Sequence, residues 1–410
     1  MNRREMLKAF GAGSLGSGWL SGASLSGGVA ASSASSAPAM GASKLGFNLC
    51  ESEKARVLKF ADAVLNEPPG SVTAARCERS AGGPHDFYSE GDYWWPDPKN
   101  PNGPYVQRDG MTNPDNFVAH RHAMVRLSRI AAALAAAHRT TGEAKYATAA
   151  ARHLRVWFLD EATRMTPHLL YAQAIKGRST GRGIGIIDTI HLVEVAQSAG
   201  ALEAAKALAG PDACGLRKWF ADYLLWIITH PYGQDERKAL NNHGTCWVMQ
   251  AAAFAKLAGD EKALEQCRAL FVEKLLPDQV ESDGRFPREL SRTKPYCYSL
   301  FNLDAMGIAA HILSRRGQDL WTAANAKGGS LKKAMEFHYP FIADKSRWPY
   351  KPDVMYYDLF PVRMPALLFG GLALDEPKYV ALWKTLDGDP TNDEVIRNFP
   401  VRQPVLWLDA

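Results

Sequence analysis

A continuous run of helix-patterned sequence constrains the fold of this chain more than any other feature. Between Phe117 and Leu374, apolar residues recur at helical spacing in segments such as HRHAMVRLSRIAAALAAAHRTTG and YSLFNLDAMGIAAHILSRRG. Short turns such as HRTTGEA, KLAGDEK and SRRGQD join these segments in pairs, and no β-alternation of comparable length occurs. The pattern predicts an all-α chain with helices at residues 51–67, 120–142, 143–160, 186–210, 214–230, 245–260, 261–276, 298–317, 331–344 and 362–374.

Paired helices that do not form a bundle can close into an α/α toroid, an incomplete barrel of helical hairpins whose loops gather at one mouth. No strict repeat such as the tetratricopeptide pattern is visible, which favours the toroid over a repeat solenoid. Hydrophobic residues make up 46% of the chain and charged residues 22%, as in a globular protein with a substantial core. We therefore predict one α/α-barrel domain over residues 41–410, with a long lid-like loop at residues 68–116.

The first 40 residues have the composition of an export signal rather than of a folded element. Arg3 and Arg4 precede a weakly apolar, Gly-rich run, which resembles a twin-arginine signal, and a Ser/Ala-rich stretch follows. The run is too polar and too often interrupted by Gly to span a membrane stably. We expect residues 1–40 to be a signal peptide and disordered linker, and the mature protein to be periplasmic or secreted, with no membrane span.

The cysteines and the net charge exclude several classes of function. Six cysteines are scattered without CxxC or Cys/His spacing, so no zinc site is predicted, and neither a metal nor another cofactor is expected. In an oxidising compartment, Cys50–Cys77 is the candidate disulfide, whereas Cys246 and Cys297 are expected to be small buried residues. The net charge of +5 argues against a dedicated nucleic-acid binder and would help to attract an acidic substrate.

Two loops carry candidate substrate-binding side chains. In the first, Tyr93, Trp94 and Trp95 lie in a Pro-rich stretch, where exposed rings can stack on sugars or can anchor the loop to the domain. The second loop, TPHLLYAQAIKGRSTGRGIGIIDT, lacks the phosphate-loop pattern but concentrates amide and cationic groups suited to carboxylate recognition. These candidates are Gln173, Lys176, Arg178 and Arg182, with a purely solvated loop as the alternative.

Two predicted helix starts carry the residues for chemistry. Asn241, Asn242 and His243 precede one helix, and Arg288 to Tyr298 precede another with three cations and two tyrosines. Asn241 is expected to cap its helix. The others suit elimination of a glycosidic bond beside a uronic acid, because donors that neutralise the carboxylate make its neighbouring carbon more acidic. A tyrosine can then transfer protons if nearby cations lower its pKa from the ordinary ~10.

The same two segments resemble those of alginate lyases with an α/α toroid fold. NNHGTCW resembles the Asn-Asn-His helix start of that family, and RELSRTKPYCYSLFNLDAM resembles its Arg-containing stretch before a catalytic Tyr. The resemblance implies that Asn242 and His243 bind or neutralise the substrate carboxylate and that Arg292 supports them. Tyr298 would be the general acid and a candidate base, while Arg288 and Tyr296 would contact substrate, with Tyr296 as the alternative acid.

We therefore expect an exported polysaccharide lyase that acts on a uronic-acid polymer, with alginate in its polymannuronate form favoured. A glucuronan or other uronate lyase is one alternative, and a non-catalytic sugar-binding protein is another. A third is an α/α-barrel glycoside hydrolase, which needs two carboxylates across the bond. The available carboxylates are Asp92, Asp97, Asp188, Asp283 and Glu289.

The stereochemistry of the sugar decides which group acts as the base. Where the proton and the leaving group lie on the same face, as in mannuronate, one tyrosine can serve as both base and acid. Where they lie on opposite faces, as in guluronate, a second group is needed, and neutral His243 is the natural base. The sequence leaves both schemes open.

Overall fold

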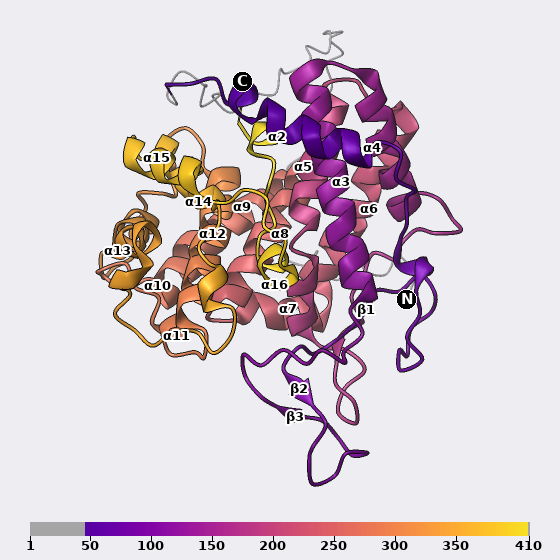
Figure 1. Ribbon diagram of the computed structural model, residues 1–410, viewed down its shortest axis with the longest axis horizontal. Helices are drawn as coiled ribbons and strands as arrows, with labels where there is room; N and C mark the ends of the chain where they lie inside the picture. Colours follow the sequence, from indigo (N-terminus) through magenta and orange to yellow (C-terminus); the bar gives the residue numbers. More distant parts are fainter. Residues whose placement is uncertain (1–45, 409–410) are drawn as a thin grey trace, which may run out of the picture. The chain divides into compact units, whose positions relative to one another are not determined.

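The computed structural model describes residues 46–408, and helices dominate this part of the chain (Figure 1). All of these residues belong to one compact unit. The α-helices are α2 (Leu49–Val64), α3 (Ala119–Thr141), α4 (Ala144–Phe158), α5 (Leu192–Ala204), α6 (Gly210–Thr229), α7 (Pro231–Lys238), α8 (Asn242–Ala258), α9 (Glu261–Leu270), α10 (Leu276–Gln279), α11 (Pro287–Leu290), α12 (Pro295–Leu313), α13 (Leu331–Ala343), α14 (Pro365–Ala373), α15 (Pro377–Thr385) and α16 (Asp393–Arg397). The predicted signal at residues 1–40 lies outside the described residues.

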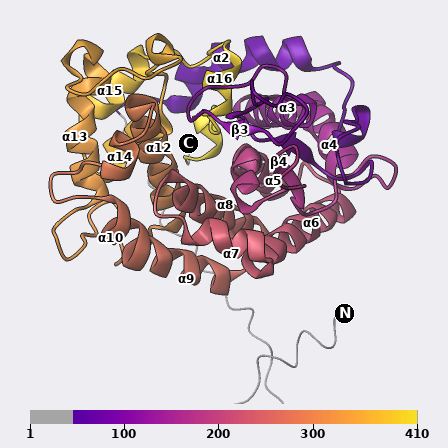
Figure 2. The same ribbon diagram turned by 90° about the horizontal axis from the view of Figure 1, so that it is seen from below.

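The helices form two concentric rows. In the inner row each helix packs on the next in chain order: α3 on α5, α5 on α8, α8 on α12, and α12 on α14. Helices α4, α6, α9, α13 and α15 pack against the outside of this row, and Figure 2 shows them following one another around it. The predicted α/α toroid, an incomplete barrel of helical hairpins, is confirmed.

Burial explains why the two rows differ in sequence. Most residues of α8 and α12 are buried, on all sides of each helix, and most of these are apolar. The outer helix α9 instead buries one face, through Ala263, Leu264 and Cys267. A helix that is apolar all round belongs in a core, whereas an amphipathic one covers it.

Four short strands were not expected from the sequence. β1 (Tyr88–Glu90) pairs in parallel with β4 (Tyr171–Ala174), and β2 (Trp94–Trp95) pairs antiparallel with β3 (Val106–Gln107). Strands of two to four residues are too short to show an alternating pattern. Figure 1 shows the β2–β3 hairpin extending beyond the helices at the end where α7 and α16 lie, so part of the predicted lid-like loop is a β-hairpin.

Several predicted helix boundaries differ from those observed. The predicted helix at 186–210 is divided into a 3₁₀ segment, η4 (Gly183–Thr189), and α5, and a π-helical turn, η5 (Phe271–Leu275), separates α9 from α10. Helix α12 starts at Pro295 rather than residue 298, because proline is well suited to the first helical turn.

The cysteine prediction is corrected in part. Cys50 and Cys77 are both free thiols, so the candidate disulfide is not formed, whereas Cys246 and Cys297 are buried as expected. Within residues 46–408, no helix is both long and apolar enough to cross a membrane.

Candidate active site

A cavity of about 110 Å³ at the start of α8 and α12 collects most of the predicted site residues. Side chains from five separate parts of the chain line it, including the last helix before the C-terminus. The lining residues are Asp92, Tyr93, Trp94, Gln107, Asp109, Gln173, Arg182, Ile184, Ile187, Asn242, His243, Arg292, Tyr298, Phe301, Arg397 and Asn398. The four predicted catalytic residues, Asn242, His243, Arg292 and Tyr298, are therefore brought to one place.

Two adjacent asparagines begin α8 and have different structural roles. The Asn241 side chain accepts a hydrogen bond from the backbone N–H of His243 at 3.3 Å, so Asn241 is the N-cap, as predicted. The backbone N–H and Nδ2 of Asn242 both donate to the carboxylate of Glu289, each at 2.7 Å. Glu289 is 1% exposed, so it fixes the Asn242 amide at the cavity wall from behind.

His243 is oriented by a carboxylate that the sequence analysis did not identify. Its Nδ1 lies 2.6 Å from Oε1 of Glu236, which is 3% exposed on α7. A carboxylate accepts hydrogen bonds, so Nδ1 carries the proton and Nε2 is left for the cavity. Burial alone would lower the pKa of His243, but the charge and hydrogen bond of Glu236 raise it above its ordinary value.

The hydroxyl of Tyr298 is hydrogen-bonded to the hydroxyl of a second tyrosine. The hydroxyl oxygens of Tyr298 and Tyr93 are 2.8 Å apart, and the guanidinium of Arg292 lies 4.6 Å from the Tyr298 ring centroid. Burial, followed by the neighbouring Tyr93, raises the pKa of Tyr298 well above its ordinary value, and Arg292 only partly opposes this. Nearby cations were expected to lower this pKa. It is raised instead, because the charge of Arg292 does not offset the removal of the phenol from water.

Arg292 is engaged by a carboxylate from the lid-like loop. Its Nη2 donates to Oδ1 of Asp109 at 2.7 Å, its Nε donates to Oδ2 at 3.3 Å, and the Thr293 hydroxyl donates to Oδ2 at 2.9 Å. Burial would raise the pKa of Asp109, but the hydrogen bond and charge of Arg292 lower it below its ordinary value. Asp109 therefore holds the guanidinium that was expected to support the substrate carboxylate.

A buried charge network lies behind the two tyrosines. Lys294 is 1% exposed, donates to Glu394 at 3.1 Å, and has its Nζ 5.4 Å from the Tyr93 ring and 6.0 Å from the Tyr298 ring. Burial opposes its charge, but Glu394 and Tyr93 raise the pKa of Lys294. A permanent cation is thus fixed beside both phenols.

The C-terminal helix α16 closes one side of the cavity. Arg397 donates to Asp92 at 2.7 Å and to Glu394 at 3.1 Å, and Arg121 of α3 forms an ion pair with Asp92 at 2.8 Å. Arg397 and Asn398 were not expected as site residues, because they approach from a distant part of the chain and no local pattern marks them. Lys294 is one of the three cations of the predicted segment 288–298, but no role was assigned to it from the sequence.

Gln173 and Arg182 lie in the cavity as predicted, in a constrained arrangement. Gln173 has a positive φ of 50°, donates through Nε2 to Asp188 at 3.0 Å, and accepts from Arg182 at 2.9 Å. A non-glycine residue in this backbone region is uncommon and is held by its surroundings. The two side chains form a fixed polar wall.

Five predicted contact residues do not line the cavity. Tyr296 is fully buried and donates its hydroxyl to the carbonyl of Phe341, so it cannot replace Tyr298 as the acid. Arg288 is exposed, and Trp95 donates its indole N–H to the carbonyl of Met111. Lys176 and Arg178 line a separate groove.

The carboxylates do not form the pair that a glycoside hydrolase requires. Asp92 and Asp109, the two acids that line the cavity, are both ion-paired with arginines, and Glu289 is occupied by Asn242. Among residues 46–408, no group of three or more His, Cys, Asp and Glu side chains is arranged to hold a metal ion.

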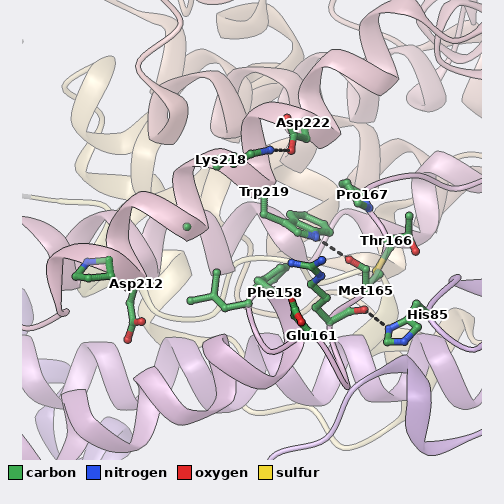
Figure 3. A pocket seen from close by; sticks show the side chains of 14 residues that line it. His85, Phe158, Glu161, Met165, Thr166, Pro167, Asp212, Lys218, Trp219 and Asp222 are labelled. Carbon is green, nitrogen blue, oxygen red and sulfur yellow. Dashed lines mark hydrogen bonds and ion pairs between the residues drawn. The ribbon is translucent and has the colours of Figure 1, made fainter. Parts of the chain in front are cut away.

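A larger cavity of about 720 Å³ lies elsewhere, beside α4 and α6 (Figure 3). Figure 3 shows Lys218 paired with Asp222 and the indole of Trp219 bonded to the carbonyl of Met165. Asp212 is also ion-paired, with Arg155. No residue of this cavity lines the smaller one. The smaller cavity is the candidate active site because the predicted catalytic side chains meet there, although its volume is lower.

Comparisons with known proteins agree with this fold. A sequence model described as alginate lyase matches residues 71–348. An alginate lyase from Bacteroides ovatus is 31% identical, with a TM-score of 0.76 over 89% of this chain and 99% of that one. Alginate lyase A1-III from Sphingomonas species A1 shares the fold at 14% identity, with a TM-score of 0.53 over 86% of this chain and 95% of that one. A search of curated proteins gave no match.

The fold and the matched residues define a class of enzyme, the polysaccharide lyases. Within that class, the chain belongs to the alginate lyase family.

Proposed function

We propose that this lyase cleaves alginate by β-elimination, with Tyr298 as the general acid and His243 as the base. The convergence of Asn242, His243, Arg292 and Tyr298 on one cavity is the observation that supports the proposal. The Bacteroides and Sphingomonas relatives are named as alginate lyases, which supports alginate as the polymer.

The reaction needs the substrate carboxylate to be neutralised first. Removing the proton at C5 places negative charge next to a carboxylate, and fixed donors lower the energy of that state. The Asn242 amide is held by Glu289, and the second N–H of its Nδ2 remains available. Arg292 supplies a cation at the same wall once it is released from Asp109.

The proton transfers are divided between two residues. Nε2 of His243 takes the C5 proton, the electron pair forms the C4=C5 double bond, and the C4–O bond breaks. The Tyr298 hydroxyl then protonates the leaving oxygen. This assignment rests on the protonation states. A phenol with a raised pKa stays protonated, so it has a proton to give and cannot act as the base, whereas an imidazole bonded to Glu236 through Nδ1 is a strengthened base.

A separate base and acid suit guluronate, in which the proton and the leaving group lie on opposite faces. Mannuronate would require Tyr298 to be ionised first, and burial opposes that. The proposed scheme thus favours polyguluronate, whereas polymannuronate was favoured from the sequence. We predict faster turnover of polyguluronate near neutral pH, and a rise in polymannuronate turnover at alkaline pH.

Ultraviolet absorbance tests the proposal. The protein is incubated with polyguluronate, polymannuronate, glucuronan and a glycosaminoglycan, and absorbance of the unsaturated product is followed together with reducing ends. Absorbance that rises with reducing ends on alginate supports the proposal. Reducing ends without absorbance would instead indicate hydrolysis.

Export is a separate part of the proposal. The twin-arginine pattern at Arg3 and Arg4 supports a periplasmic or secreted location, where an extracellular polymer is accessible. Fractionation of cells that express the full chain, with Arg3→Lys and Arg4→Lys together as the control, tests it. Export that does not depend on the two arginines would contradict the twin-arginine assignment.

A further inference from the structure

Lys176 and Arg178 lie outside the catalytic cavity and line a second groove of about 710 Å³. Arg79, Tyr88 and Glu90 form one part of this groove, and the loop at residues 174–180 forms the rest. It is more than six times as large as the catalytic cavity and shares no lining residue with it.

The groove carries positive charge that the protein does not compensate. Glu90 is the only carboxylate among its lining residues, and Arg79 neutralises it through two hydrogen bonds of 2.6 and 2.7 Å. Lys176 and Arg178 form no ion pair with a carboxylate in the described part of the chain. Two cations are thus left for an external anion.

Aromatic residues of the β2–β3 hairpin hold both cations in place. Arg178 donates through Nε to the carbonyl of Tyr105 at 2.7 Å, and its guanidinium lies 5.2 Å from the Trp94 ring centroid. Lys176 Nζ lies 5.6 Å from the Tyr105 ring centroid. Gly177, with a φ of 72°, allows this close approach, because a Cβ there would lie 2.9 Å from the backbone of Pro104.

Trp94 connects the groove to the catalytic cavity. Its ring lines the cavity, and Arg182, another cavity residue, lies 5.8 Å from the same ring centroid. A continuous row of cations and aromatic surface therefore runs from one hollow to the other, through Arg182, Trp94, Arg178, Tyr105 and Lys176. Cations with an aromatic face match the carboxylates and sugar rings of a polyuronate.

We infer that this groove is an accessory subsite that binds carboxylates of the polyuronate chain on sugar units that extend past Trp94, beyond the catalytic cavity. The inference rests on the proposed function. The subsite makes the enzyme favour long chains over short ones, since only a chain that extends past Trp94 contacts both the catalytic cavity and the groove of Lys176.

The double variant Lys176→Gln with Arg178→Gln tests the inference. We expect KM for polymeric alginate to rise about tenfold, since each lost charge-assisted contact weakens binding. The kcat on the polymer should be unchanged. For a trisaccharide that the enzyme cleaves to an unsaturated product, kcat/KM should stay at the wild-type value. Lys218→Gln, which removes one exposed charge beside the cavity of Figure 3, is the matched control and should leave KM unchanged.

The outcomes separate this inference from the proposed function. A double variant with wild-type KM on the polymer would overturn the subsite while the lyase assignment stands. An equal loss on trisaccharide and polymer would also overturn it, because the two cations would then act at the catalytic cavity. A wild-type protein that gives no absorbing product from any uronate polymer would overturn the proposed function itself.

Discussion

At the scale of single residues, the proposed reaction depends on the protonation of two side chains that face one cavity. His243 must be neutral to accept a proton, and Tyr298 must be neutral to donate one. Their hydrogen-bond partners are Glu236 and Tyr93, which affect the reaction only through His243 and Tyr298. Changes at the partners should therefore alter pH dependence and turnover more than binding.

Glu236→Gln should move the acidic limb of the kcat/KM profile to lower pH. The Glu236 carboxylate raises the pKa of His243 and burial lowers it. Removing the charge of Glu236 should therefore lower the pKa of His243. The neutral base then persists to lower pH. The measurement is kcat/KM on polyguluronate from pH 5 to 9, with Asp235→Asn, an exposed neighbouring acid, as the control. An unmoved limb would show that His243 is not the base.

The same ion pair has a consequence for stability. The pKa of His243 is raised in the folded state, so its contribution to the free energy of unfolding is fully present below about pH 6.5, the ordinary pKa of histidine, and is lost as pH rises through the folded pKa. The gap in unfolding free energy between wild type and His243→Gln should therefore narrow as pH increases over that range.

Tyr93→Phe should lower kcat by about tenfold, with little change in KM, because it removes the hydrogen bond that holds the Tyr298 hydroxyl in position. The ring and its contact with Lys294 remain. Tyr356→Phe is the control, since the Tyr356 ring also lies near Lys294, at 5.0 Å, but does not line the cavity. Equal effects of both variants would assign Tyr93 a structural role.

At the scale of elements, the lid-like loop closes the site. The cavity of about 110 Å³ is well below the roughly 300 Å³ or more of typical ligand sites, so a polymer requires the loop to move. Asp109 holds this loop to Arg292 with a carboxylate, the same group that the substrate presents. A substrate carboxylate can therefore replace Asp109 at Arg292 and release the loop.

Asp109→Asn should lower KM, because the weaker amide contact favours the open loop. The effect should be about threefold, as expected for a partly exposed ion pair worth less than 1 kcal/mol. Steady-state kinetics on polyguluronate provide the measurement, with Asp115→Asn elsewhere in the loop as the control. A raised KM would mean instead that Asp109 positions Arg292 for the substrate.

The sequence predicted some elements of the site and not others, for physical reasons. Asn242 and His243 are adjacent at a helix start, and Arg292 and Tyr298 lie six residues apart, so local patterns identify them. Glu236 becomes a partner of His243 only through the corner between α7 and α8. The raised pKa of Tyr298 depends on burial, which a list of nearby cations does not reveal.

At the scale of the whole molecule, the site is assembled from both ends of the described chain. The family match ends at residue 348, yet Arg397 and Asn398 line the cavity and Glu394 holds Lys294. The toroid itself was predictable, because helical spacing and the short turns that join the helices in pairs are visible in the sequence. The position of α16 beside the catalytic cavity was not predictable, because the sequence of a five-residue helix does not indicate where that helix packs.

Arg397→Met should destabilise the protein by about 3 kcal/mol, because Asp92 and Glu394 then lose a largely buried cation. Chemical denaturation followed by circular dichroism measures the change. Arg397→Lys keeps the charge and should recover part of the loss. A variant as stable as wild type would show that the C-terminal helix does not depend on this network.

The most direct test of the central claim compares wild type with Tyr298→Phe on polyguluronate, with both ultraviolet absorbance and polymer binding measured. The account predicts an absorbing product from wild type, a fall in kcat of about a thousandfold or more in Tyr298→Phe, and retained binding. A Tyr298→Phe protein that keeps most of its activity would contradict the assignment of Tyr298 as the acid.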